Sequence, residues 1–315
     1  MSELILHHYP MSPFAEKVRL IMGYKQLPWR SVLIPPVMPK PDVVALTGGY
    51  RKTPVLQIGA DIYCDTALIA RVLEARQSTP TLYPASSPLA VPLAQWADSF
   101  LFQASVVWAL QPAGAPAIMA GVPPETLKAF AADRAAMRGG ATRPTLADGA
   151  AQLRGHLTLI EAQLAQGAES AQGGPWLFGA APSIADFSVA QCLWFIRRAA
   201  PVARLLDEYA AIGPWLDRVL AIGHHTSTDI SSAEALALAA SAPGQAPVAV
   251  APELGFDAGQ AVTVAATDYG SDPVAGTLVG LSGDEVVIRR SDDRAGSVQV
   301  HFPRFGFQIK KDTRA

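Results

Sequence analysis

The order of strand-like and helix-like runs in the first eighty residues constrains the fold more than any other feature of this chain. Short apolar runs alternate with an amphipathic helical run, and Gly59-Ala60 separates two strand-like runs as in a hairpin. The predicted strands cover 4–6, 29–34, 55–58 and 61–63, and the predicted helices cover about 13–24 and 66–76. This β-α-β then β-β-α order predicts a thioredoxin-like α/β domain over residues 1–82.

The next part of the chain has the periodicity of helices. Apolar residues recur at helical spacing, as in Leu153, Leu157, Ile160 and Leu164. The run Ser183-Ile184-Ala185-Asp186 has the pattern of a capping box, in which hydroxyl and carboxylate satisfy the free amides at a helix start. We therefore expect an all-helical domain over residues 88–241.

The C-terminal part changes character after a Pro- and Gly-containing stretch over 242–247, which is typical of a linker. Five short β-rich runs follow, separated by turn sequences such as Ser282-Gly283-Asp284. They predict a small β-barrel-like domain over 248–315, SH3-like in the number and length of its strands.

Composition excludes several function classes. The formal net charge of −2 offers no basic excess for nucleic acid or an anionic membrane surface. An uncharged stretch over 99–124 is interrupted by Pro112, Gly114 and Pro116, which favours a buried helix and loop over a membrane span. Only Cys64 and Cys192 are present, as expected for a reducing compartment, and we predict a cytoplasmic protein.

Ser12 begins the run Ser12-Pro13-Phe14-Ala15-Glu16-Lys17-Val18-Arg19-Leu20, at the predicted start of the first helix. The free amides and the dipole of a helix N-terminus favour an anion there, and a hydroxyl can donate to a thiolate. The same serine also fits an ordinary N-cap before proline. Ala15 stands where a CxxC motif would need its second cysteine, which disfavours redox chemistry.

Two further motifs follow in the same domain. Thr53-Pro54 precedes a strand, and a cis bond there would turn the Thr53 backbone outward for pairing with an extended peptide. A trans proline that begins an edge strand is the alternative. Asp65-Thr66 opens a helix and suits an ammonium and a carboxylate, although an N-cap with nothing bound is equally compatible.

The run from Ser12 to Leu20 resembles the helix start of omega-like cytosolic glutathione transferases, with serine where a cysteine is typical. This resemblance covers about residues 1–225 and implies a serine-type transferase in which Ser12 is the catalytic group that stabilises the glutathione thiolate. Tyr9 is the rival for that role, because tyrosine-type transferases use a phenol near the first strand.

The resemblance also implies a glutathione site and an acceptor pocket. Glutathione would contact Phe14, Lys52, Thr53, the cis residue Pro54, Asp65 and Thr66. Lys52, with Arg51 as a weaker candidate, would meet the glycine carboxylate, and Asp65 the γ-glutamyl ammonium. The hydrophobic electrophile would lie between the domains, against Tyr9, Trp96, Phe100 and Trp108, with Phe14 and the region of Met119 as further candidates.

The predicted function is therefore conjugation of glutathione to a hydrophobic electrophile, in a homodimer that serves detoxification. The alternative is a non-catalytic protein that binds glutathione or another ligand, with the β-rich tail docking a partner. Metal is not expected, because His7 and His8 face opposite ways in a strand and no ligand cluster accompanies them or His224-His225.

Overall fold

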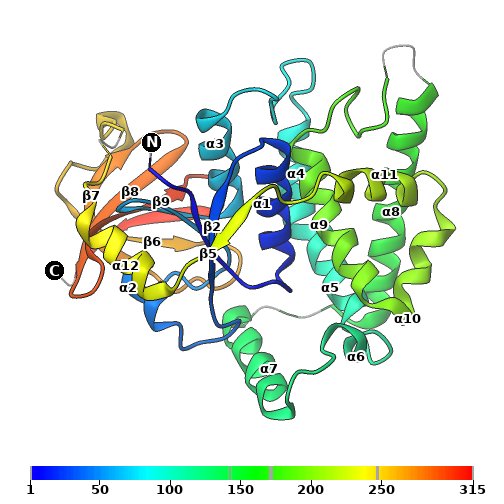
Figure 1. Ribbon diagram of the computed structural model, residues 1–315, viewed down its shortest axis with the longest axis horizontal. Helices are drawn as coiled ribbons and strands as arrows, with labels where there is room; N and C mark the ends of the chain where they lie inside the picture. Colours follow the sequence, from blue (N-terminus) through cyan, green and yellow to red (C-terminus); the bar gives the residue numbers. More distant parts are fainter. Residues whose placement is uncertain (1, 141, 143, 170–172, 246–247, 314–315) are drawn as a thin grey trace.

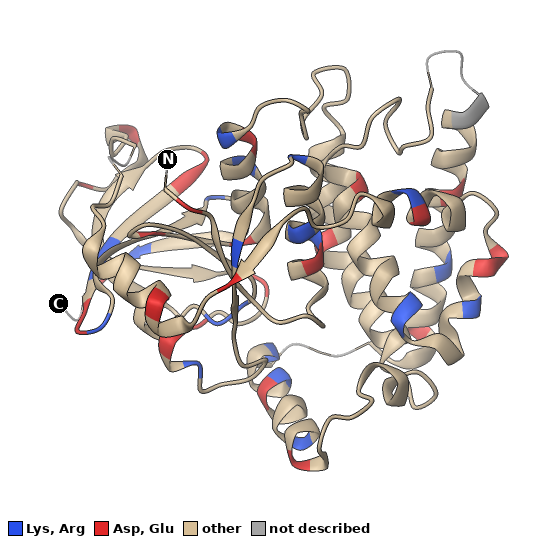
Figure 2. Cartoon of the chain, viewed as in Figure 1, with Lys and Arg blue, Asp and Glu red and all other residues tan. Residues whose placement is uncertain are grey.

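The computed structural model describes residues 2–140, 142, 144–169, 173–245 and 248–313. Two residues of the predicted linker, 246–247, lie outside this description. The sheet and the helices of the middle part of the chain occupy two sides of the molecule, with the first helix between them (Figure 1). Figure 2 shows acidic and basic residues intermixed along the backbone on both sides. No helix in the described part of the chain is long and apolar enough to cross a membrane.

The N-terminal part has the predicted thioredoxin-like order. Its elements are β1 (Ile5–His8), α1 (Pro13–Tyr24), β2 (Trp29–Leu33), α2 (Pro41–Thr47), β3 (Val55–Ile58), β4 (Asp61–Cys64) and α3 (Thr66–Arg76). α1 and α3 have the predicted bounds, whereas α2 lies in a proline-rich segment where no helix was predicted. Strand β1 pairs parallel with β2 and antiparallel with β3, which pairs antiparallel with β4.

The middle of the chain is helical, as predicted. Its elements are α4 (Ala90–Trp96), the π-helical turn η1 (Ala97–Leu101), α5 (Phe102–Ala109), α6 (Ala115–Ile118), α7 (Pro124–Arg138), α8 (Leu146–Glu169), α9 (Ile184–Arg198), α10 (Ala200–Ala203), η2 (Arg204–Glu208) and α11 (Ile212–Ala221). The predicted capping box is present at the start of α9. Helix α7 projects away from the other helices, at the lower edge of Figure 1.

The last part of the chain adds further strands to the sheet. Its elements are β5 (Ser227–Asp229), α12 (Ser232–Ser241), η3 (Pro252–Leu254), β6 (Ala261–Ala266), β7 (Val274–Leu281), β8 (Glu285–Asp292), β9 (Gly296–Pro303) and β10 (Phe307–Lys311). Strand β5 pairs with β2, and α12 packs on α2, β2 and β9. Both elements fall in the range predicted for the helical domain, yet they lie against the thioredoxin-like sheet.

The five strands of the tail confirm the predicted β-rich region and extend the N-terminal sheet. Strands β6 to β9 form an antiparallel meander, and β10 pairs with β6. Strand β9 then pairs parallel with β4, with Asp61 opposite Gln299. Among the described residues this makes one sheet of ten strands in the order β10-β6-β7-β8-β9-β4-β3-β1-β2-β5.

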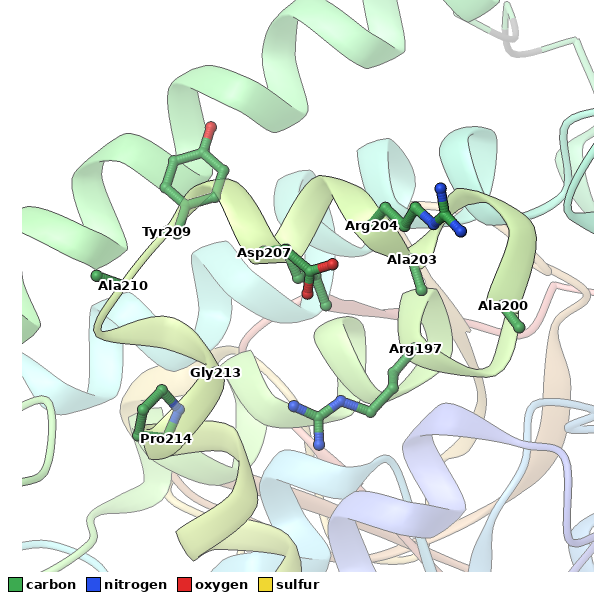
Figure 3. Close-up of a pocket in the computed structure, with 10 residues that line it drawn as sticks. Arg197, Ala200, Ala203, Arg204, Asp207, Tyr209, Ala210, Gly213 and Pro214 are labelled. Carbon is green, nitrogen blue, oxygen red and sulfur yellow. The ribbon is translucent and has the colours of Figure 1, made fainter.

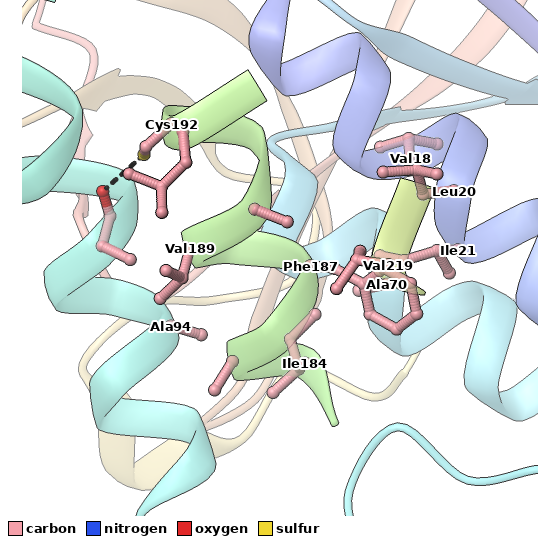
Figure 4. Close-up of a cluster of buried hydrophobic side chains, with 14 of the residues drawn as sticks. Val18, Leu20, Ile21, Ala70, Ala94, Ile184, Phe187, Val189, Cys192 and Val219 are labelled. Carbon is pink, nitrogen blue, oxygen red and sulfur yellow. Dashed lines mark hydrogen bonds between the residues drawn. The ribbon is translucent and has the colours of Figure 1, made fainter. Parts of the chain in front are cut away.

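Two hydrophobic clusters cover the two faces of this sheet. One joins α1, α3 and β3 to the helical domain, with Phe187 of α9 near Ile21 of α1 and Ala70 of α3 (Figure 4). The other fills the space between the opposite face, α2, α12 and the tail, and includes Ile5, Val262 and Phe302. Each fully buried large apolar side chain contributes about 1.5–3 kcal/mol, so these clusters fix the tail firmly to the N-terminal domain.

Candidate functional site

Strand register brings the three predicted motifs to one end of the sheet. His7 lies opposite Val55, and Val55 lies opposite Cys64. Tyr9 to Ser12 follow β1, Thr53-Pro54 precede β3, and Asp65-Thr66 follow β4. Because β1 and β4 run antiparallel to β3, all three motifs lie at the same end of these three adjacent strands.

Ser12 is the N-cap of α1. Its Oγ accepts a hydrogen bond from the Ala15 amide at 3.2 Å, and its own amide donates to the Tyr9 carbonyl at 3.1 Å. The residue is only 1% exposed. The cap uses the hydroxyl as an acceptor, so its hydrogen is still available as a donor at the positive end of the helix.

Thr53-Pro54 has a cis peptide bond, which confirms the prediction for this step. Within the described residues, neither backbone polar group of Thr53 has a hydrogen-bond partner. Its side-chain Oγ1 accepts from Lys40 Nζ at 3.0 Å. An extended ligand can therefore pair with this backbone as with a strand edge.

Asp65 and Thr66 open α3. The Asp65 carboxylate accepts from the Ala67 amide at 2.8 Å, its only side-chain hydrogen bond to a described residue. Burial raises the pKa of Asp65, against the lowering effect of that bond and of the charges on Lys17 and Lys52. The Thr66 hydroxyl accepts from Lys17 Nζ at 3.1 Å. Asp65 is thus a largely desolvated acid to which no cation is directly bonded within the described residues.

Lys17 is a buried cation that the sequence did not single out. Its Nζ lies 2.5 Å from Asp98 Oδ2, and Asp98 also accepts from Ser188 at 3.4 Å and Gln191 at 3.2 Å. This network joins the base of the site to η1 and α9. Its members are far apart in the sequence, so only the fold could reveal it.

The two cations before Thr53 already have partners. Lys52 Nζ is 2.6 Å from Asp268 Oδ1 of the segment between β6 and β7, and lies 4.4 Å from the Tyr269 ring centre. Arg51 pairs with Asp133 of α7 and lies 3.7 Å from Asp272. The acidic partners of both cations were not foreseen.

Tyr9 lies at the same edge, against α7. Its hydroxyl accepts from Arg134 at 3.2 Å, and Lys40 Nζ lies 5.9 Å from its ring centre. Tyr9 is therefore held by cations, whereas Ser12 caps the helix. Which of the two hydroxyls faces a bound sulfur stays a prediction.

Each aromatic residue predicted for the acceptor pocket has its own surroundings in the structure. Trp96 packs edge-on against His156 of α8, with ring centres 4.9 Å apart. Phe100 is 64% exposed, and the Trp108 indole donates to the Val202 carbonyl at 3.0 Å. Phe14 instead packs on Phe102 of α5, with ring centres 4.6 Å apart.

Phe102 was not among the residues predicted for the pocket, and it directly follows η1, whose π-helical geometry changes the phase of the side chains from that of an ordinary α-helix.

The adjacent histidines of β1 face opposite ways, as predicted. His7 Nε2 bonds Gln57 at 2.8 Å, and His8 Nε2 bonds Ser31 at 3.1 Å. Burial lowers the pKa of each imidazole to about 4. Among the described residues, no group of three or more His, Cys, Asp or Glu side chains is arranged to hold a metal ion.

A surface pocket of about 540 Å³ lies elsewhere, in the helical domain (Figure 3). Its polar lining includes Arg197, Arg204 and Asp207, and Arg197 is already paired with Asp217 at 2.5 Å. None of the predicted site residues lines this pocket.

Comparison with known proteins places this arrangement in a family. The model of the glutathione S-transferase N-terminal domain matches residues 6–81, and that of the C-terminal domain matches residues 129–218. The crystal structure of a GST-like protein from Pseudomonas syringae is 45% identical, covers 99% of this chain and 100% of its own, and superposes with a TM-score of 0.79. The chain belongs to the glutathione S-transferase family.

Two further relatives define the breadth of the similarity. The FtsZ-localized protein A of Caulobacter vibrioides is 27% identical over 229 residues, which is 68% of this chain and 82% of that protein. The glutathione transferase GSTFuA3 from Phanerochaete chrysosporium is 18% identical, with a TM-score of 0.56 over 70% of this chain and 98% of its own. The similarity to GSTFuA3 shows a shared fold alone. The Pseudomonas syringae protein, by its coverage, also shares the β-rich tail.

Proposed function

We propose that this protein is a glutathione transferase that conjugates the glutathione thiolate to a hydrophobic electrophile. The observation that carries the proposal is Ser12 at the N-cap of α1, beside an unpaired Thr53 backbone and a desolvated Asp65 at the same sheet edge. These groups are complementary to a short peptide with a thiol in its middle and charges at both ends.

Each part of glutathione has a counterpart in this arrangement. The cysteine backbone pairs with Thr53, next to Pro54. The γ-glutamyl ammonium approaches Asp65, whose raised pKa reflects a half-buried, desolvated acid that gains from a cation. The γ-glutamyl carboxylate meets Thr66 and the free amides that begin α3, and the glycine carboxylate meets Lys52.

The chemistry follows from the sulfur position above α1. A free thiol with a pKa of about 8.5 is mostly protonated at neutral pH, and only the thiolate is a good nucleophile. The Ser12 hydroxyl donates to that sulfur and the helix dipole stabilises its negative charge, so the thiol proton leaves more easily. The thiolate then forms a carbon–sulfur bond as the leaving group departs with its electron pair, or adds to an activated double bond that afterwards takes up a proton.

The test compares wild type with Ser12→Ala and Tyr9→Phe. A hydrogen bond to a charged group contributes about 1.5–3 kcal/mol, so Ser12→Ala should lower kcat/KM about 10- to 100-fold. The pH midpoint of the thiolate absorbance of bound glutathione should rise in Ser12→Ala and stay in Tyr9→Phe. Equal conjugation rates in wild type and Ser12→Ala would refute this role, and the opposite pattern would assign it to Tyr9.

A second candidate is a protein that binds glutathione or another ligand without turnover and docks a partner through its tail. The specific observation in its favour is that Arg51 and Lys52 are already paired within the chain. In addition, one relative is named for its location with FtsZ rather than for a reaction. Intact glutathione binding with no conjugation across a panel of aryl halides and activated alkenes would favour this candidate.

We further propose a cytoplasmic homodimer that serves detoxification. The buried free cysteines Cys64 and Cys192 are consistent with a reducing compartment. Light scattering after size-exclusion chromatography tests the dimer, and a mass equal to one chain at micromolar concentration would reject it.

A further inference from the structure

The segment between β6 and β7, residues 267–273, lies over Lys52, which is proposed above to meet the glycine carboxylate of glutathione. Asp268 Oδ1 is 2.6 Å from Lys52 Nζ, and the Tyr269 ring centre is 4.4 Å from the same nitrogen. The Lys52 side chain is only 12% exposed. A carboxylate of the chain itself therefore already binds this largely buried cation.

Contacts on two sides hold the segment in place. The Gly270 amide donates to the Met137 carbonyl of α7 at 2.7 Å. Gly270 has φ +57, and a Cβ added there would lie 3.1 Å from Met137 Cε and 3.5 Å from Lys52 Cε. Asp272 approaches Arg51 to 3.7 Å, on the side next to α7. The positive φ favours glycine at this position, and the backbone bond to Met137 fixes the segment against α7.

Tyr269 belongs to the same segment, and its phenol interacts electrostatically with Asp65. Burial raises the pKa of the Tyr269 phenol, and the charges of Asp268 and Asp65 add to that effect. The hydroxyl is thus within electrostatic range of the acid proposed to meet the γ-glutamyl ammonium.

We propose that Asp268 is a specificity-determining residue of the thiol site, because it competes with the carboxylate at the glycine end of the ligand for Lys52. The inference rests on the proposed function. A second carboxylate must displace Asp268 or lie beside it, where two negative charges repel. A ligand whose glycine end is uncharged avoids that cost. The co-substrates that fit best are γ-glutamyl thiols of this kind, such as an ester or amide of the glycine carboxylate of glutathione.

Calorimetric titration of the full chain with glutathione and with its glycine ethyl ester tests this inference. The variant is Asp268→Asn, which keeps the shape and removes the charge. The matched control is Asp284→Asn, an exposed aspartate in the turn at the other end of β7. Lys52→Met is added to remove the cation for which the two carboxylates compete.

Wild type should bind the ester more tightly than glutathione. Since an ion pair with one exposed partner is worth at most about 1 kcal/mol, Asp268→Asn should tighten glutathione binding about three- to fivefold. The affinity for the ester should change less than about twofold in Asp268→Asn. Asp284→Asn should leave the affinity for both ligands unchanged. Lys52→Met should weaken the binding of glutathione more than that of its ester, because the cation is lost while the negative charge of Asp268 remains.

Two results would overturn the inference in distinguishable ways. If glutathione and its ester bind equally in wild type, Asp268→Asn and Asp284→Asn, the thiol site stands and Asp268 has no role in selectivity. If neither thiol binds any of these proteins, including Asp268→Asn, the proposed function fails together with the inference.

Discussion

Asp61 begins β4 and Asp65 follows the end of the same strand, and their surroundings differ in almost every respect. Asp61 is fully buried and accepts bonds from His301 at 3.0 Å, Gln299 at 3.3 Å and the Gln245 amide at 2.9 Å. Among the described residues, the Asp65 carboxylate accepts one hydrogen bond, from an amide of its own helix. The first acid is saturated by the tail, whereas the second has capacity for a ligand.

This difference shows which end of β4 stabilises the fold and which is available for chemistry. Buried polar groups whose hydrogen bonds are all formed fix how two elements pack. A desolvated polar group with unformed hydrogen bonds can instead gain free energy when a ligand supplies the missing partners. The four predictions below test this division, in order of expected size.

Replacing Asp61 by alanine should have the largest effect. Removing one partner of a buried charge network costs about 3–5 kcal/mol, because His301 and Gln299 would stay buried while each loses one of its acceptors. The midpoint of urea unfolding, followed by tryptophan fluorescence, measures the loss. An unchanged midpoint would show that the junction of β4 and β9 adds no stability.

Replacing Asp65 by alanine should mainly affect ligand binding. Loss of a charged partner for the γ-glutamyl ammonium should weaken glutathione affinity by about 1.5–3 kcal/mol. Loss of the N-cap should lower the stability by about 1 kcal/mol. Asp65→Asn keeps the cap and removes the charge, so calorimetry on both variants separates the two effects. If Asp65→Asn binds glutathione as wild type does, the proposed contact is absent.

Replacing Glu285 by glutamine should cost less than the Asp61 substitution. Glu285 Oε1 lies 2.7 Å from His301 Nδ1, but its side chain is 20% exposed and water can replace part of the interaction. We expect a loss of about 1 kcal/mol in urea unfolding. A loss as large as that of Asp61→Ala would mean that both acids are equally essential to the junction.

The pH dependence of stability should be the smallest effect. Burial lowers the pKa of His301, but the bonds to Asp61 and Glu285 outweigh it and hold this pKa above its ordinary value of 6.5. The contribution of His301 is therefore fully present below about pH 6.5 and is lost as pH rises through the raised pKa. Urea midpoints measured across this range should fall at the alkaline end, and His301→Gln should remove that part of the slope.

Local patterns predicted most of the N-terminal domain and the helix starts. The bounds of α1 and α3, the capping box at Ser183 and the cis bond at Thr53-Pro54 agree with the structure. Helix α2 was missed because its first turn lies among prolines, which read as a loop. Each correct element depended on caps, spacing or motif within a few residues of its own position.

Long-range pairing could not be read from the sequence. Gln299 and Asp61 are separated by 238 positions, and Lys52 and Asp268 by 216. No sequence pattern links an exposed loop aspartate such as Asp268 to its partner. The contact between Asp268 and Lys52 could therefore be found only from the fold. The acceptor pocket stays a prediction, and the π-helical turn at Ala97–Leu101, which changes the phase of the side chains that follow it, could not be read from the sequence either.

The pairing of β9 with β4 has a consequence for any shortened form of this protein. A chain ending before the tail would leave β4 as an outer strand, with its hydrogen-bonding groups open to any neighbouring chain. It would also bare the apolar side chains that Phe302 and Val300 now cover. Such a fragment is a candidate for self-association, so the tail is better regarded as the outer wall of the thioredoxin-like domain than as a removable module.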